Sequence, residues 1–422
     1  MALFWGGQMW IQLLNIFTIV YFLSSCSRLP VAPKDAARVS TINQWQDQKS
    51  LSSFKIALTN TISSLKKSKA QKLRLGPKVI EKSAYLESLS YIQRCTGKKK
   101  DLHRIIENNF TPYTVFGKEN WGEILMTSYY EPVLRGTSKK TKRYQTPIYS
   151  APKNLVEIKL NQFEIEDYGL EGISKPRVSA QVIKGDNGQN HVVPLPSRAE
   201  IDFKGALSGN NLEIAYADLI DVFFLHIQGS GILKLASGKE VRLGYAAQNG
   251  RKYEPIGKFM KDKIKPKEMS MQAIENVLRR EGAEYTKKIL SKNPSYVFFQ
   301  TLQGRSLTTI GAEVTDHRTV AVDQRYFPLG LLGHVSYPNP QTPPENLRGG
   351  DEKYTNAHFV FAQDTGGAIK GPGRADLFWG KGKKAKDQAG KMRHPAKLHF
   401  FIPKDEFISK IKSVKNKKLA CL

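Results

Sequence analysis

The sequence predicts a mainly β fold with a helical region at its N-terminal end. The chain has 422 residues, among them 33 glycines and 21 prolines, which supply the many turns that short strands need. From about residue 120 onward, short apolar runs rich in β-branched residues are separated by Gly, Pro, Asn and Ser, which is typical of strands. Residues 43–108 instead show a helical and strongly basic pattern. At ~100–200 residues per domain, the length allows two or three packed units.

The N-terminal segment has the character of an export signal. Residues 1–25 carry no charged side chain, and an apolar stretch from Met9 runs into Leu23-Ser-Ser-Cys26. This resembles the bacterial lipobox, in which the cysteine is lipidated and becomes the mature N-terminus. Two alternatives remain, an uncleaved anchor helix and an ordinary secretory signal cut near Ser25. All three predict export, so nucleic acid is not expected as a partner.

The charge balance is strongly positive. Sixty-five Lys and Arg against 38 Asp and Glu give a net charge of +27. Basic runs at Lys66–Lys78 and Lys98-Lys99-Lys100 are read either as solvated surface or as contacts with an anionic partner. Three cysteines exclude a disulfide scaffold, and the sequence leaves open whether Cys95 and Cys421 pair.

The elements follow in order after a linker-like segment, 27–42, and the basic helical region. Strands are expected at Ile124–Met126, Val156–Leu160, Val178–Ile183, Leu219–Ile227, Gly231–Leu235 and Val241–Ala246. One helix interrupts them, because Ser270 is a good N-cap, an apolar face follows it, and Gly282 ends the pattern. Residues 295–403 return to short strands and Gly-rich turns.

Three aspartates are the candidates for chemistry. An apolar strand brings Asp364 to a Gly-rich turn, and twelve residues later Asp376 precedes the aromatic pair Phe378-Trp379. Asp323 ends another apolar run. A single aspartate in such a place commonly caps a turn, but neighbouring carboxylates in a partly apolar site push one pKa upward. The region therefore favours an acid that is protonated near neutral pH.

Two reactions use such an acid. Asp364-Thr365-Gly366 matches aspartic proteases, but the chain has no second such triplet, so proteolysis would require a homodimer. The other reaction is cleavage of a glycosidic bond. The histidines lack metal-ligand spacing, and neither a Cys-x-x-Cys pair, a Gly-x-Ser-x-Gly elbow nor a phosphate-binding loop occurs, so we expect no metal and no cofactor.

Aromatic and amide side chains near these segments suit a carbohydrate, whose rings have apolar C–H faces and hydroxyl rims. The alternative for each is a core aromatic or a turn-forming amide. The candidate sugar-binding residues are Tyr129, Tyr130, Gln228, Gln248, Asn249, Phe378 and Trp379.

Motifs in a fixed order identify a resemblance. They are Thr127-Ser-Tyr-Tyr-Glu-Pro132, Ile227-Gln-Gly-Ser-Gly231, Val241–Tyr253, Asn293-Pro-Ser-Tyr-Val-Phe-Phe299, Ala321–Gly330 and Asp364–Gly380. Together they resemble the membrane-bound lytic murein transglycosylase A family, with its terminal domain named for three aspartates. The resemblance covers about residues 120–403.

The resemblance implies a double-psi β-barrel, formed by 111–134 and 293–405, into which a second β-barrel, 135–292, is inserted. A basic helical region, 27–110, would precede them and a basic tail, 406–422, would follow. The implied reaction splits the β-1,4 bond between N-acetylmuramic acid and N-acetylglucosamine and leaves a 1,6-anhydromuramyl end. Asp376 would be the acid and then the base, Asp364 would raise its pKa, and Asp323 would support them.

The implied partners are peptidoglycan glycan strands and, through a lipid on Cys26, the periplasmic face of the outer membrane. Murein synthases or scaffold proteins are further candidates. Two alternatives remain: a non-catalytic peptidoglycan-binding lipoprotein and a water-dependent hydrolase. The sequence leaves open whether the enzyme would act from strand ends, as an exo-acting enzyme, or within strands.

Overall fold

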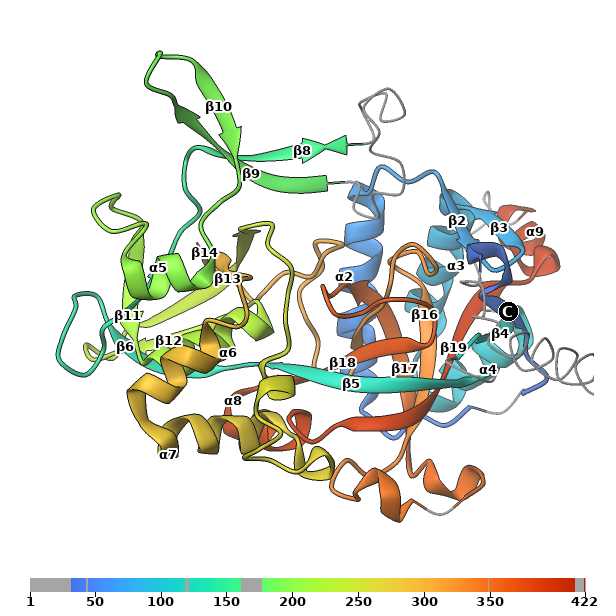
Figure 1. Ribbon diagram of the computed structural model, residues 1–422. Coiled ribbons are helices and arrows are strands. Elements are labelled where there is room, and N and C mark those ends of the chain that lie inside the picture. Colours follow the sequence, from blue (N-terminus) through green and yellow to red (C-terminus); the bar gives the residue numbers. More distant parts are fainter. Residues whose placement is uncertain are drawn as a thin grey trace, which may run out of the picture.

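The predicted mainly β architecture is confirmed by a computed structural model (Figure 1). The structure describes residues 32–42, 45–117, 121–160, 177–347, 349–413 and 421. The predicted export signal, 1–25, and Cys26 lie outside the described residues. In the part of the chain that is described, no helix has both the length and the apolar character needed to cross a membrane.

The first barrel is a ring of six strands. The long strand β19 (Arg393–Pro403) closes it, pairing through its first half with β5 (Glu123–Glu131) and through its second half with β16 (Leu332–Tyr337). The other members, in ring order from β16, are β17 (Asn356–Asp364), β15 (Thr319–Ala321) and β18 (Arg374–Lys381), which returns to β5. The β18–β5 and β15–β17 pairs are parallel. Beyond β19, the strands β4 (Phe110–Val115) and β1 (Ala37–Val39) extend the sheet.

The second barrel is nearly closed. Its six strands follow the order β14 (Val297–Leu302), β13 (Glu240–Gln248), β12 (Gly231–Leu235), β6 (Val133–Thr137), β11 (Glu213–Ala217) and β7 (Thr146–Tyr149). A bridge between Ser150 and Phe299 links the two ends. A three-stranded sheet of β8 (Leu155–Lys159), β9 (Arg177–Lys184) and β10 (Asn190–Val193) projects from this barrel at the top of Figure 1.

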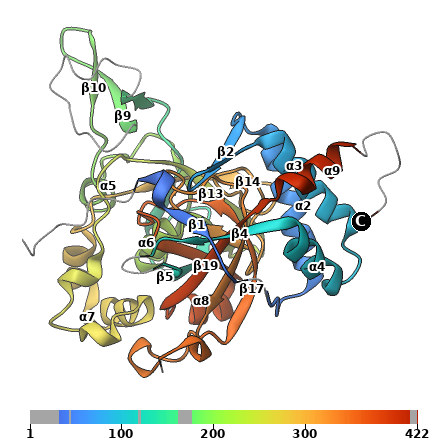
Figure 2. The same cartoon turned by 90° about the vertical axis from the view of Figure 1, so that its right-hand side faces the viewer.

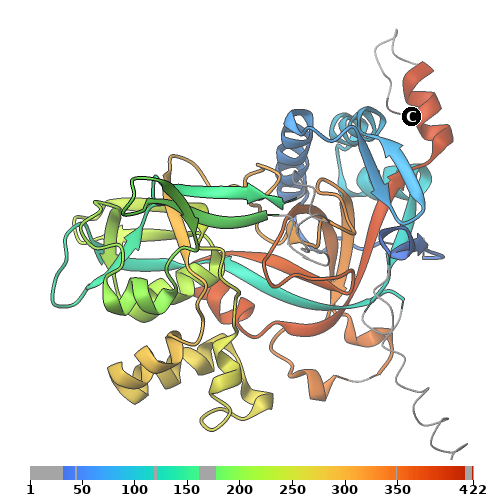
Figure 3. The ribbon, with the colours of Figure 1, turned by 45° about the horizontal axis from the view of Figure 1, so that its top comes forward.

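Helices from both ends of the chain cover the first barrel. They are α2 (Leu51–Lys67), α3 (Lys82–Cys95), α4 (Lys99–Asn109) and α9 (Asp405–Ser413), with the hairpin β2 (Lys72–Leu75) and β3 (Lys78–Glu81). Helix α2 buries residues at helical spacing, and the ring of Phe54 lies 5.4 Å from that of Phe361 on β17. Helices α3, α4 and α9 lie on the side away from the second barrel (Figures 2 and 3).

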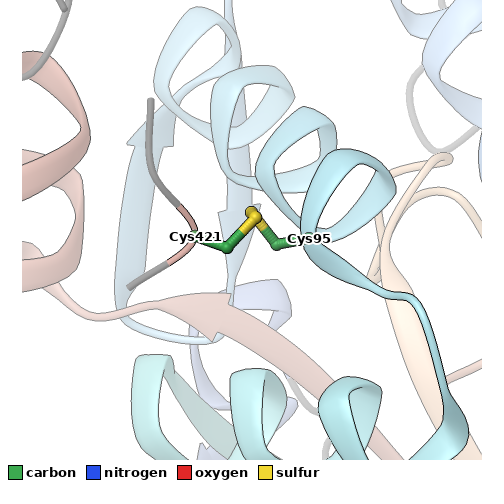
Figure 4. The surroundings of a disulfide bond; sticks show 2 residues. All are labelled: Cys95 and Cys421. Carbon is green, nitrogen blue, oxygen red and sulfur yellow. A yellow bond between two sulfur atoms is a disulfide. The ribbon is translucent and has the colours of Figure 1, made fainter. Parts of the chain in front are cut away.

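A disulfide joins these helices to the tail. Cys95, the last residue of α3, is bonded to Cys421 (Figure 4). The sequence left this pairing open. Because the bond fastens the tail to α3, it adds a covalent link to the packing of the helical region.

The strand predicted at Leu219–Ile227 is wrong, because this segment is the helix α6 (Leu219–Gln228). Asp218 caps it by accepting hydrogen bonds from the N–H groups of Ile220 and Asp221, and Gly229 ends it with a φ of 76°. The helix is packed between two apolar clusters, so its sequence is apolar on most sides and lacks the helical periodicity. Such a run cannot be told from a buried strand by pattern alone.

Other elements refine the expected order. Helix α7 (Met271–Leu290) begins at Ser270 as predicted, breaks at Gly282, where φ is 85°, and then continues. Strand β14, placed in the first barrel from the sequence, pairs with β13 of the second. Helices α5 (Arg198–Lys204) and α8 (Gly382–Ala389) were not predicted. Short 3-10 helices lie at Pro33–Asp35, Ile256–Phe259, Pro266–Glu268, Pro344–Asn346 and Asp351–Lys353.

Candidate active site

The alternation of side chains along β5 and β18 defines two faces of this strand pair. On β18, Ala375 and Leu377 point into the core of the first barrel, as Ile124 and Met126 do on β5. Their neighbours project from the outer face, because successive side chains in a strand point to opposite sides. We call this outer surface the β5–β18 face. Its members, in cross-strand pairs, are Arg374 opposite Leu125, Asp376 opposite Thr127, and Phe378 opposite Tyr129.

Asp376 is an acid whose charge the fold disfavours. Its Oδ1 atom is buried and makes no hydrogen bond in the part of the chain that the structure describes. Burial raises the pKa of this carboxyl from 3.8 to about 6, against the opposing effects of the Thr127 hydroxyl and the Arg374 guanidinium. The negative charge of Asp364 adds to the rise, in the direction expected from the sequence, but burial is the larger cause.

Asp364 is held by several donors. Asp364 is the last residue of β17 and pairs with Ala321 of β15. Asp376 pairs with the same Ala321 from the other side of β15. The two aspartates are therefore two strands apart, which corresponds to about 10 Å between their Cα atoms. The Oδ1 atom of Asp364 accepts hydrogen bonds from Thr309 N (3.0 Å), Thr309 Oγ1 (2.7 Å) and Thr365 N (2.9 Å). Its Oδ2 accepts one from the Tyr129 hydroxyl at 3.0 Å.

Tyr129 links Asp364 to the β5–β18 face. Burial, and the negative charges of Asp364 and Asp376, raise the pKa of the Tyr129 hydroxyl well above its usual value. The hydroxyl therefore stays protonated and donates to Asp364. Its ring contacts that of Phe378, with centroids 5.2 Å apart. The two aromatic side chains thus stand beside Asp376 on one surface.

Asp323 fixes the loop between β17 and β18. It is 6% exposed, and it accepts hydrogen bonds from Arg325 Nη2 at 2.6 Å and from the N–H of Gly371, in that loop, at 2.8 Å. Burial acts to raise the pKa of Asp323, but the bonds from Arg325 and Gly371 outweigh it and lower the pKa below 3.8. We call Asp323, Arg325 and Gly371 the loop anchor.

Two of the predicted aromatic residues lie away from this face. Tyr130 is 2% exposed and packs with Ala385 and Ala389 of α8. Trp379 packs against the same cluster, its Nε1 lies 3.3 Å from the Met392 sulfur, and its ring lies 4.5 Å from that of His317. Alternation explains the separation, because Tyr130 and Trp379 follow Tyr129 and Phe378 directly in the chain.

The three amides are also dispersed. Gln228, the last residue of α6, accepts a hydrogen bond from the Tyr130 N–H at 2.9 Å and so ties the second barrel to β5. Asn249 is 1% exposed and donates to the carbonyl oxygens of Pro196 and Pro294. Gln248, at the end of β13, is exposed. Contact of these residues with a sugar stays a prediction.

Sequence reasoning missed three contributors. Thr127 faces Asp376, Thr309 holds Asp364, and Arg325 holds Asp323. Thr127 could have been found from its place on an alternating strand beside the aspartate strand. Thr309 lies in a long connection after β14 whose sequence carries no motif, so no signal pointed to it. Among the described residues, no group of three or more His, Cys, Asp or Glu side chains is arranged to hold a metal ion.

Comparisons with protein families match two parts of the chain. Residues 125–300 match the MltA specific insert domain, and residues 318–401 match the 3D domain. Membrane-bound lytic murein transglycosylase A of Escherichia coli K12 is 30% identical over 285 residues, 66% of this chain and 65% of that protein. The Vibrio cholerae protein of the same name is 27% identical over 286 residues, with the same coverage. The chain thus spans about 65% of the length of these curated relatives.

Solved structures share the fold. A membrane-bound lytic murein transglycosylase from Agrobacterium tumefaciens has a TM-score of 0.71 and 26% identity, covering 87% of this chain and 98% of that one. MltA from Neisseria gonorrhoeae has a TM-score of 0.64 and 26% identity, covering 84% and 87%. Escherichia coli MltA with bound chitohexaose has a TM-score of 0.61 and 23% identity, covering 87% and 94%.

Proposed function

Since this chain belongs to the membrane-bound lytic murein transglycosylase A family, we propose that it is a lytic transglycosylase that cleaves peptidoglycan glycan strands. The observation that carries the proposal is Asp376, an acid with a pKa of about 6 on an outer barrel face beside aromatic side chains. A protonated carboxyl near neutral pH is what a glycosidic leaving group requires. The chitohexaose held by the Escherichia coli relative supports a glycan ligand.

The reaction needs one group that acts twice. The protonated Asp376 donates its proton to the oxygen of the β-1,4 bond, and the bond from that oxygen to C1 of the muramyl ring breaks. The resulting carboxylate then takes the proton of the muramyl C6 hydroxyl while O6 bonds to C1. A 1,6-anhydro ring forms, Asp376 regains its proton, and no water is consumed.

The other aspartates serve Asp376 indirectly in this proposal. Asp364 contributes negative charge near the acid, and the four hydrogen bonds that it accepts leave it poorly placed to attack a sugar carbon. Asp323 keeps the loop before β18 in place through Gly371. Tyr129, which is partly exposed, offers a ring surface to a sugar, whereas Phe378 is 2% exposed and packs against the Tyr129 ring.

We propose that the protein works in the cell envelope. The Cys95–Cys421 disulfide supports an oxidising compartment, and the names of the relatives describe membrane-bound enzymes. The predicted lipid on Cys26 would supply the membrane attachment on the periplasmic face of the outer membrane. The net charge of +27 suits a wall rich in carboxylates.

The test is mass analysis of the soluble products after digestion of isolated peptidoglycan sacculi by the purified protein. We expect anhydromuropeptides from the wild type and none from Asp376→Asn. Asp387→Asn, on the exposed side of α8, is a matched control that should keep the activity. Products with reducing ends would show a hydrolase instead. Binding to sacculi without any release would support the non-catalytic lipoprotein.

A further inference from the structure

One basic side chain on the β5–β18 face has no partner in the network around the aspartates. Arg374 stands two residues before Asp376 on β18, so both project from the same side with their Cα atoms about 7 Å apart. Its Nε atom is buried and makes no hydrogen bond with any residue that the structure describes. A buried N–H group without a hydrogen-bond acceptor destabilises the folded protein, so this group points to a ligand that supplies the acceptor.

Two fully buried arginines are each matched to a carboxylate. Arg318 contacts Asp47 at 2.8 Å, and Arg198, whose Nε is also buried without a hydrogen bond among the described residues, contacts Asp202 at 3.3 Å. The half-exposed Arg325 contacts Asp323 at 2.6 Å. Each of these arginines, which have structural roles, is therefore paired with an aspartate of the same chain. Arg374 has no such ion pair within the described ranges, although it stands on the face that carries the candidate acid.

The charge of Arg374 acts on groups that belong to both barrels. Burial raises the pKa of both Asp376 and Tyr253, and in each the positive charge of Arg374 acts against burial. Asp376 belongs to the first barrel, whereas Tyr253 follows β13 of the second and is 38% exposed. A ligand at Arg374 would therefore also lie near Asp376 and near a partly exposed tyrosine.

We propose that Arg374 binds a carboxylate of the glycan substrate, namely the free lactyl carboxylate of the muramyl residue whose C1 reacts. The proposal rests on the function proposed above. The lactyl ether is attached to C3 of that ring, so its carboxyl lies several ångströms from the bond that Asp376 protonates, which suits the ~7 Å step along β18. A guanidinium is well suited to a carboxylate, because it donates two parallel hydrogen bonds.

This assignment specifies a substrate class. Where a stem peptide is attached, the lactyl carboxyl is an amide and has no charge. The favoured strands are then those from which the peptides have been removed, and an amide hydrolysis must supply them.

The test compares three tetrasaccharides of alternating N-acetylglucosamine and N-acetylmuramic acid. One carries free lactyl carboxylates, the second carries neutral lactyl methylamides, and the third carries a dipeptide with its own carboxylates. For the wild type we expect kcat/KM on the free acid to exceed that on the methylamide by about 10- to 100-fold, the usual range for a charge-assisted hydrogen bond. This comparison needs no variant, so a folding defect cannot obscure it.

Variants then assign the preference to Arg374. With Arg374→Met, the values of kcat/KM on the free acid and on the methylamide should lie within about twofold of each other. Arg374→Lys should retain part of the difference, because it keeps the positive charge but cannot donate two parallel hydrogen bonds. Lys370→Met removes a neighbouring exposed charge and should change nothing. Equal wild-type values on the acid and the methylamide would overturn the proposal.

Two other results have distinct meanings. A preference for the dipeptide substrate that Arg374→Met removes would overturn the lactyl assignment in favour of a peptide carboxylate. If the wild type forms anhydro products from none of the three, the proposed function fails and this inference fails with it.

Discussion

The β5–β18 face and the loop anchor each centre on an aspartate, and the fold treats the two charges in opposite ways. Asp323 receives hydrogen bonds from Arg325 and Gly371 that lower its pKa, whereas Asp376 has one buried oxygen without a hydrogen bond among the described residues and a pKa of about 6. The loop anchor gains stability from its charge, and the β5–β18 face loses stability when its acid ionises. Asp376 is thus the proposed reactive carboxyl and Asp323 the stabilising one, and the loop between β17 and β18 connects them.

The largest expected effect is that of Asp376→Asn. Removing a general acid should lower the rate of anhydromuropeptide release by about 10³-fold or more. The same change should stabilise the protein at pH 8, because a neutral amide replaces a carboxylate that burial disfavours. The pKa difference, 3.8 against about 6, sets an upper limit of about 3 kcal/mol at 1.36 kcal/mol per pH unit.

Urea unfolding of Asp376→Asn and wild type at pH 4 and pH 8 checks this prediction. A raised folded-state pKa means that the folded carboxyl holds its proton more tightly than the unfolded one, so the wild type loses stability as the pH rises from 3.8 through about 6. The advantage of the variant should therefore be larger at pH 8. An advantage of equal size at both pH values would contradict this account of Asp376.

The pH dependence of the wild type gives the next largest effect. Since only the protonated form of Asp376 can start the reaction, kcat/KM should fall about tenfold per pH unit above a midpoint near 6. Steady-state rates on soluble glycan strands between pH 4.5 and 8.5 measure it. A rate that keeps rising past pH 7 would show that Asp376 is not the proton donor.

A smaller effect is expected from Asp323→Asn. The amide keeps the shape but loses charge-assisted hydrogen bonds to Arg325 and Gly371, so we expect a loss of about 2 kcal/mol in the free energy of unfolding. Because the folded pKa of Asp323 is lowered, its contribution is present above the unfolded value of 3.8 and disappears as the pH falls through the folded value.

Urea unfolding of Asp323→Asn at pH 3 and pH 7 tests the contrast with Asp376. The deficit of the variant should shrink at pH 3, opposite in sign to the change seen with Asp376→Asn. The midpoint of the pH–rate profile should stay near 6, since Asp323 does not titrate there. A shifted midpoint would mean that the loop anchor acts on Asp376 and does not only hold the loop.

The smallest effect is expected from Tyr129→Phe. It removes one of four hydrogen bonds to Asp364 and leaves the aromatic ring beside Phe378, so we expect about 1 kcal/mol of lost stability and a rate within about fivefold of wild type. Tyr216→Phe, on β11, is a control in the second barrel. A loss as large as that of Asp376→Asn would place the Tyr129 hydroxyl in the reaction itself.

Local pattern and motif order were enough to predict part of the fold. Residue pattern predicted the β-rich class and the helix capped by Ser270, whereas the two-barrel arrangement was implied by the family resemblance that the ordered motifs carry. Prediction failed at Leu219–Gln228, where burial on most sides removed the periodicity that separates a helix from a strand. At the candidate site the aspartates could be named, but their differences depend on burial and on donors such as Thr309, which come from distant parts of the chain.

The candidate sugar-binding residues show the same limit. Composition grouped Tyr129 with Tyr130 and Phe378 with Trp379, although alternation turns the second member of each pair to the other side. Asn249 and Gln228 are amides that satisfy backbone groups, which a sequence cannot distinguish from amides left free for a ligand.

The closure of the first barrel has a consequence for the order in which the strands can pair. Strand β5 ends at residue 131, but its neighbour β18 begins at residue 374, about 240 residues later. The strands of the second barrel all lie between residues 133 and 302, so they can pair with one another before β18 is available. Until about the last eighth of the chain is in place, half of the β5–β18 face is therefore a strand with unpaired edges that is exposed to aggregation.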